Sequence, residues 1–293
     1  MGSVSTPALA IAVAEAGGVG TITALGMSAG TLENVVGDMA AATSGVLAVN
    51  FLTDGIDRDA VAAAAGRVRI VDFFWTDPDQ SLVQLAHDGG ALACWQVGAL
   101  DEAKSAADAG CDAIAVQGTE AGGHVRGSSP LLPLLAAVLG AVDVPVIAAG
   151  GIADRDSFQA VVDAGASGAR VGTRFIATDE SGAHPLYKQA VADAGTDSTE
   201  ITGVFNVCPL CATSPRCRVL RSSIDALRAL PDEIVGEGTL GDNAFSLPRG
   251  HGMPPGVTTT GHIEAMPMYA GESVALIHDV RPVASVIEEL SGS

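Results

Sequence analysis

Short runs of β-branched and apolar residues recur from residue 7 to about residue 175, separated by Ala- and Leu-rich segments with helical spacing. These runs are predicted to be strands, and they cover residues 19–25, 46–52, 69–75, 91–97, 111–117, 144–150 and 168–175. Several of the intervening segments end in glycine, as helices often do. Regular alternation of strand and helix is typical of a parallel sheet built from βα units.

The predicted fold is therefore a TIM-type (β/α)₈ barrel with its core in residues 1–175. The chain begins with a helix, whereas a closed barrel of eight strands needs one more strand before that helix. We expect this first strand to be absent from the sequence or supplied from upstream. The repeat stops after residue 175, and we expect residues 176–293 to be a mostly helical extension. It shows no strand pattern and is expected to pack on the barrel without folding independently.

The composition suits a compact globular protein that does not bind nucleic acid. Hydrophobic residues make up 48% of the chain and charged residues 17%, and 34 acidic against 15 basic side chains give a net charge of -19. Without a cluster of Lys and Arg, the surface offers no path for a nucleic acid backbone. An anionic ligand would have to be held locally by backbone N–H groups.

Targeting and metal signals are weak in this sequence. No basic stretch precedes the first apolar run, and no run of about 18 apolar residues occurs, so we expect a cytoplasmic protein without membrane attachment. The five cysteines are an odd number in a long chain, which favours reduced thiols over a disulfide framework. Cys208 and Cys211 have the spacing of a zinc ligand pair, with Cys217 nearby, but a structural zinc site needs four ligands. We predict no metal and leave the role of these cysteines open.

Two glycine-rich sites lie at the last two predicted strands, one at the end of residues 144–150 and the other within residues 168–175. They are residues 150–154 and the pair Gly172 and Thr173. In (β/α)₈ barrels the loops at these positions commonly bind a phosphate group, because glycine lets the backbone approach the anion. Tight turns alone would also explain the glycines. Asp154 is expected to cap the following helix.

The loop after the fifth predicted strand, residues 116–124, carries an amide, a carboxylate and an imidazole. Gln117 can donate and accept hydrogen bonds at once, which suits the pyrimidine edge of a flavin. His124 follows two glycines at the mouth of the barrel, where it can act on a substrate as a general base or as a cationic anchor near neutral pH. The other five histidines are interpreted as surface residues.

Six motifs together resemble the nitronate monooxygenase family, once called 2-nitropropane dioxygenases. In chain order they are STPALAIAVAEAGGVGTI (5–22), VNF (49–51), AVQGTEAGGH (115–124), PVIAAGGIAD (145–154), VGTRF (171–175) and YAGESV (269–274). The resemblance implies non-covalently bound FMN and a catalytic His124. It also implies FMN contacts from Asn50, Gln117, Gly122, Gly151, Gly172 and Thr173.

The reaction implied by the resemblance is the oxidation of an alkyl nitronate by dioxygen to a carbonyl compound and nitrite. Many members carry Gln where this chain has Arg170, a cation that could pair with phosphate or alter the flavin. Two alternatives stay open: an FMN-dependent NAD(P)H reductase of the same superfamily, resembling enoyl-acyl-carrier-protein or quinone reductases, and a non-catalytic, degenerate flavin-binding barrel. The physiological substrate and the oligomeric state, including a homo-oligomer, are also open.

Overall fold

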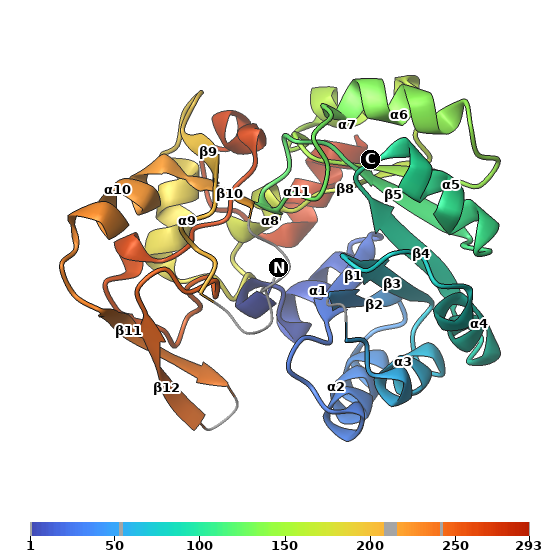
Figure 1. The fold of residues 1–293 in the computed structure, drawn as a ribbon, viewed down its shortest axis with the longest axis horizontal. Coiled ribbons are helices and arrows are strands. Elements are labelled where there is room, and N and C mark those ends of the chain that lie inside the picture. The colour runs from blue at the N-terminus through green and yellow to red at the C-terminus, as the bar shows by residue number, and fades with distance from the viewer. Residues whose placement is uncertain (1, 53–54, 208–215, 241–242, 293) are drawn as a thin grey trace.

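A curled sheet of seven parallel strands forms the centre of the molecule (Figure 1). The computed structural model describes residues 2–52, 55–207, 216–240 and 243–292. The strands, in their order across the sheet, are β1 (Val19–Thr23), β2 (Val46–Leu52), β3 (Ile70–Phe74), β4 (Leu92–Val97), β5 (Ala113–Gln117), β7 (Val146–Ala149) and β8 (Gly168–Arg170). A strand lies in each of the seven predicted segments, but the last one ends at Arg170, and residues 173–175, predicted as strand, begin α8. In the described chain β1 and β8 are the two edges, so the sheet is a partly open barrel.

Helices cover the outer face of this sheet. They are α1 (Pro7–Glu15), α2 (Ala29–Ala42), α3 (Arg58–Ala65), α4 (Gln80–Asp88), α5 (Leu100–Asp108), α6 (Leu131–Leu139) and α7 (Arg155–Asp163). Polar side chains at their N-caps fix where several of them begin, because these accept hydrogen bonds from otherwise unpaired N–H groups. Asp154 caps α7 as predicted, and forms a reciprocal capping box with Ser157.

The two faces of the sheet differ in polarity, because side chains alternate between them along each strand. The outward positions, such as Val49 and Val71, are fully buried against the helices. The inward positions Asn50, Asp72 and Cys94 lie in register on β2, β3 and β4. The inside of the curled sheet is therefore polar where a closed barrel would have packed branched side chains.

The extension contains strands that its sequence did not predict. In addition to α8 (Thr173–Ile176), α9 (Pro185–Ala192), α10 (Arg221–Ala229) and α11 (Val283–Ser291), it has β9 (Thr199–Thr202), β10 (Cys217–Leu220), β11 (Ile234–Leu240), β12 (Asn243–Pro248) and β13 (Thr260–Gly261). Three short 3-10 helices complete the description: η1 (Gly2–Val4), η2 (Ile263–Ala265) and η3 (Glu272–Leu276). The expectation that residues 176–293 lack strands was wrong, because short strands with glycines and mixed polarity give little periodic signal.

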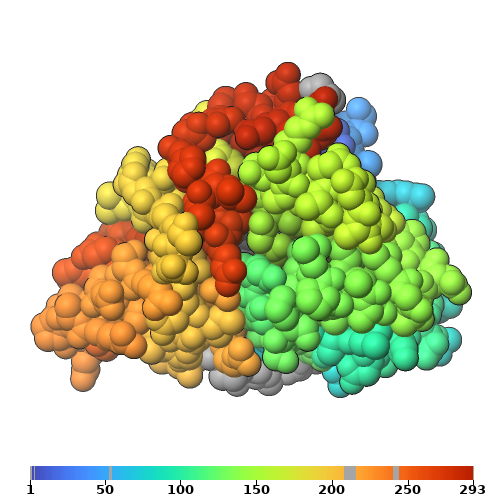
Figure 2. All heavy atoms as spheres, turned by 90° about the horizontal axis from the view of Figure 1, so that it is seen from above, coloured from blue at the N-terminus to red at the C-terminus, as the bar shows by residue number. Residues whose placement is uncertain are grey.

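The extension meets the barrel at several places, among them the loop after β5 and helix α1. The short strand β6 (Gly123–His124), in the loop after β5, pairs with β10, so the loop that carries His124 is an edge of the extension's own sheet. At the other end, Val286 and Leu290 of α11 are buried in a cluster with Leu9 of α1. Figure 2 shows the C-terminal residues, in red, between the extension and the green residues of the barrel.

Candidate functional site

Glycines at the carboxyl ends of β7 and β8 leave backbone donors free. Gly150 and Gly151 have φ angles of 116° and 73°, which side chains with a Cβ rarely adopt. In the described part of the chain, the N–H groups of Gly151 and Gly172 donate to no protein acceptor. Both glycines are half-buried, not sealed from solvent. Two unpaired donors at neighbouring strand ends can bind an anion such as a phosphate.

The segment 269–274 closes against these loops. Thr173 is buried, and its Oγ1 accepts a hydrogen bond from the N–H of Gly271 at 2.9 Å. A Cβ on Gly122 would lie 2.5 Å from the nitrogen of Gly271 and 2.6 Å from the carbonyl carbon of Ala270. Gly122 therefore allows the loop after β5 and the late segment to pack backbone against backbone. This contact accounts for the glycine at position 122 without any ligand.

His124 lies between two aromatic rings. Its imidazole centroid is 5.9 Å from the ring of Trp75, with an angle of 68° between the planes, and 5.7 Å from the ring of Tyr269. Burial lowers the pKa of His124 to about 4, because the charged form loses its hydration. The imidazole is therefore neutral at pH 7 and can accept a proton or donate one hydrogen bond. The expectation of a cationic anchor at neutral pH does not fit this environment.

Gln117 holds the loop that carries His124. Its Nε2 donates to the carbonyl of His124 at 2.9 Å, and its Oε1 accepts from the N–H of Arg126 at 3.1 Å. The side chain is 4% exposed. One amide hydrogen and one carbonyl lone pair are left after these two bonds, and a ligand can use only those. Gln117 thus has a structural role that its sequence position did not reveal.

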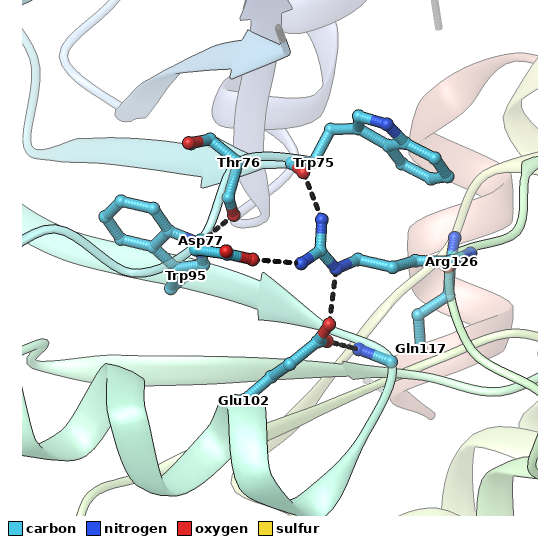
Figure 3. A network of polar contacts seen from close by, with 8 residues as sticks. Trp75, Thr76, Asp77, Trp95, Glu102, Gln117 and Arg126 are labelled. Atoms are coloured by element: carbon cyan, nitrogen blue, oxygen red, sulfur yellow. Dashed lines mark hydrogen bonds and ion pairs between the residues drawn. The ribbon is translucent and has the colours of Figure 1, made fainter. Parts of the chain in front are cut away.

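The guanidinium of Arg126 is the centre of a polar network that joins the loop after β5 to the loop after β3 and to the first turn of α5 (Figure 3). Its Nε donates to Glu102 at 2.6 Å, a second nitrogen donates to Asp77 at 2.7 Å, and the third donates to the carbonyl of Trp75. Although burial opposes it, the hydrogen bonds and charges of Glu102 and Asp77 raise the pKa of Arg126. Trp75 itself has a φ of 85°, a strained conformation that costs about 1–3 kcal/mol for a residue of this size.

A second charged group lies inside the curled sheet. Asn50 donates to Oδ2 of Asp72 at 2.5 Å, and Arg170 donates to both carboxylate oxygens of Asp72 and to Gln96 at 2.5 Å. Arg170, for which the sequence suggested a phosphate or flavin partner, thus has a protein partner across the barrel. Asn50 lies in this network at the inner face of the sheet.

The sequence predicted which strand ends lie together at one edge of the sheet, but it did not reveal the residues that support them. Gln117, Ala149 and Arg170 lie in register on β5, β7 and β8, so Gln117 and the two glycine sites share one edge of the sheet. Asp72 had a usable signal, since it is a carboxylate in the middle of the apolar strand IVDFF. Trp75 and Arg126 gave none, because their importance depends on contacts between distant loops.

The three cysteines that the structure describes are buried. Cys217 on β10 is buried, and burial raises the pKa of its thiol to about 12. Cys208 and Cys211 lie outside the described residues. Within the ranges that the structure describes, no group of three or more His, Cys, Asp or Glu side chains could hold a metal ion. In the same ranges no helix combines the length and the apolar character needed to cross a membrane.

A parallel sheet covered by helices, with its candidate site at the carboxyl ends of the strands, defines an enzyme fold of the (β/α)-barrel class. The particular family follows from comparison: residues 54–292 match the family model described as nitronate monooxygenase, and the chain belongs to that family.

Curated relatives carry two kinds of name. Over 204 residues the chain is 34% identical to (3aS,4S,5R,7aS)-5-hydroxy-7a-methyl-1-oxo-octahydro-1H-indene-4-carboxyl-CoA dehydrogenase of Rhodococcus jostii, covering 69% of this chain and 57% of that protein. It is 32% identical over 148 residues to a probable nitronate monooxygenase of Bacillus subtilis, covering 48% and 43%. The chain thus spans about half the length of these relatives.

Solved structures agree over nearly the whole chain. FabK from Thermotoga maritima has a TM-score of 0.78 and 26% identity, covering 99% of this chain and 88% of that one. Nitroalkane oxidase from Streptomyces ansochromogenes has a TM-score of 0.76 and 26% identity, covering 99% and 92%. Both match the barrel and the extension alike, so the chain has the fold of an oxidoreductase.

Proposed function

We propose that this protein is an FMN-dependent enzyme that oxidises alkyl nitronates with dioxygen to a carbonyl compound and nitrite. The observation that carries the proposal is the neutral, aromatic-lined His124 at the same sheet edge as the free N–H groups of Gly151 and Gly172. Family membership and the likeness to nitroalkane oxidase support this choice.

The residues at this edge fit FMN. The N–H groups of Gly151 and Gly172 are unpaired in the described structure, and they would hold the phosphate, with the Thr173 hydroxyl still able to donate. The remaining amide hydrogen of Gln117 and the amide of Asn50 would meet the polar edge of the ring, and Gly122 would border it. When bound, FMN supplies the electron transfer between substrate and dioxygen.

His124 would act on the substrate itself. A neutral imidazole can donate a hydrogen bond to a nitronate oxygen, which carries negative charge, or accept the α-proton of a neutral nitroalkane. The rings of Trp75 and Tyr269 exclude water from two sides of the imidazole. A water-poor site strengthens these polar interactions with the substrate.

A second candidate is a flavin-dependent reductase or dehydrogenase that uses NAD(P)H. The name of one relative favours it, since the protein from Rhodococcus jostii is a carboxyl-CoA dehydrogenase, and FabK from Thermotoga maritima shares the fold over nearly the full chain. The same cofactor site and the same His124 would serve this reaction. The candidates therefore differ in the reductant, not in the architecture.

One spectroscopic experiment separates the candidates. The visible spectrum of the purified protein is recorded after reconstitution with FMN, and then propionate 3-nitronate or NADH is added without oxygen. We expect flavin bands that bleach with the nitronate and release nitrite when air is admitted. Bleaching by NADH alone would establish the reductase, and a colourless protein would indicate a degenerate barrel without cofactor.

The wider setting is also a proposal. We infer a cytoplasmic enzyme, because three of its five cysteines are free and buried and none of these forms a disulfide. Its partners would be the small nitronate, dioxygen and, in a homo-oligomer, further copies of the chain. We also propose that residues 176–293 depend on the barrel, since α11 packs against α1.

A further inference from the structure

Trp75 has a backbone conformation that needs outside support. Its φ of 85° lies in the left-handed region, where a residue with a bulky side chain is strained. It directly follows the last residue of β3, so the chain leaves the sheet in this strained conformation. Such conformations persist only where neighbouring contacts outweigh the strain. The contacts that support Trp75 therefore indicate its role.

Arg126 supplies the main contacts. It donates to the carbonyl of Trp75, and its guanidinium carbon lies 5.8 Å from the centre of the Trp75 ring. Glu102 orients the guanidinium from below, with Nε–Oε1 at 2.6 Å, and Asp77 binds it from the side (Figure 3). The carboxylate of Glu102 is itself fixed, because its second oxygen accepts the N–H of Gly98 at 2.7 Å. The guanidinium of Arg126 is therefore held in one orientation.

The same loop reaches His124. Arg126 follows His124 by two positions, and Gln117 binds the backbone of both. The Trp75 ring meets the imidazole at 5.9 Å in an edge-on arrangement, on one side, and Tyr269 covers another side. A change at Arg126 would release the strained Trp75 and uncover the imidazole.

We propose that Arg126 is a positioning residue that holds Trp75 in its left-handed conformation and so keeps the indole ring against the imidazole of His124. This proposal rests on the proposed function, because it concerns the side chains that surround the proposed base, His124. The test measures the pKa of His124 and needs no turnover. The positioning role and the proposed function can therefore fail independently of each other.

The test is an NMR titration of the protein labelled with ¹³C at histidine Cε1, between pH 5 and pH 8. The His124 signal is the one absent from H124N. In the unchanged chain it is expected not to titrate, since burial lowers the pKa of His124 to about 4. Two titratable side chains face it: Tyr269, whose ring lies 5.7 Å from the imidazole, and Cys217, which pairs with His124 across β10 and β6. Burial raises the pKa of the Cys217 thiol to about 12.

Arg126→Gln removes the guanidinium group that holds Trp75. Water is then expected to reach the imidazole, and the pKa of His124 is expected to move toward its ordinary value of 6.5. Arg126→Lys keeps the charge but replaces three nitrogens with one, and the same shift is expected. A shift in R126Q but none in R126K would assign the effect to charge and overturn the proposal. Arg67→Gln, which breaks an exposed pair with Glu33, is the matched control and should leave the signal unchanged.

Trp75→Gly keeps the proposal testable if R126Q does not fold. Glycine adopts a φ of 85° without strain, so this variant removes the indole and leaves Arg126 in place. We expect the His124 pKa to rise in W75G as in R126Q, and the double variant to show no further rise. An unchanged pKa in W75G, or additive rises in the double variant, would overturn the proposal.

Discussion

Asp72 on β3 and Arg170 at the end of β8 face each other across the inside of the curled sheet, with Nη2 of Arg170 2.6 Å from Oδ1 of Asp72. The side chain of Asp72 is 1% exposed and that of Arg170 is 32% exposed. A second hydrogen bond, from Nη1 to Oδ2 at 3.1 Å, makes the pair bidentate. The pair connects strands that lie far apart both in the sheet order and in the sequence.

Asp72→Asn is expected to destabilise the protein by about 3 kcal/mol, the lower end for a broken buried pair, because Arg170 keeps partial access to water. Urea unfolding measures the change. The double variant D72N/R170Q should recover much of the loss, since it leaves no unpaired charge. Glu33→Gln, which breaks the exposed pair with Arg67, should change stability by less than about 1 kcal/mol. Equal losses in D72N and E33Q would contradict the assignment.

His124→Asn should lower turnover of a nitronate by a factor of about 10²–10⁴, the usual contribution of a positioned acid or base. The flavin bands should persist, because the proposed cofactor contacts lie on other residues. Stopped-flow measurement of anaerobic flavin reduction separates the two effects. If H124N reduces the flavin at the rate of the unchanged enzyme, His124 has no catalytic role.

Gly172→Asp should yield protein without bound flavin, because a side chain and a negative charge would both stand at the proposed phosphate position. The visible spectrum after FMN reconstitution provides the measurement. Gly30→Asp is the matched control: Gly30 lies in the first turn of α2, and a Cβ there would meet nothing within 4 Å. A yellow G172D protein would place the phosphate elsewhere.

Acidification should weaken the fold through His251. The interpretation of His251 as a surface residue was wrong, because its side chain is 4% exposed. Burial lowers its pKa to about 4, below its ordinary value of 6.5. Between these values the unfolded chain binds more protons than the folded chain, so stability is full above pH 6.5 and falls as the pH drops toward 4. Thermal unfolding at several pH values should show this decline, to which His124 also contributes.

His251→Asn should reduce that pH dependence. The N–H of Met253 donates to Nδ1 of His251 at 3.1 Å, and the amide oxygen of asparagine can accept in its place. His278→Asn, at an exposed histidine, is the control and should keep the full decline. An identical pH profile for H251N and the unchanged chain would mean that His251 does not titrate differently on unfolding.

The barrel strands could be predicted because their signal is local. The run VLAVNFL carries enough β-branched and apolar residues to identify β2 without any partner. In contrast, β10 has four residues, CRVL, and exists because β6 and β9 pair with it from distant parts of the chain. The glycine sites and His124 could be located from their places after predicted strands. The network of Arg126 could not, since its partners Trp75 and Glu102 are chosen by tertiary packing.

The contact between Gly122 and Gly271 joins two parts of the chain that are synthesised at different times. Translation delivers the loop with His124 well before the ribosome has synthesised Tyr269 and the segment that follows it. During that interval neither the backbone that packs on Gly122 nor the Tyr269 ring beside His124 has been synthesised. The loop after β5 therefore gains these contacts only after residues 269–271 have been synthesised.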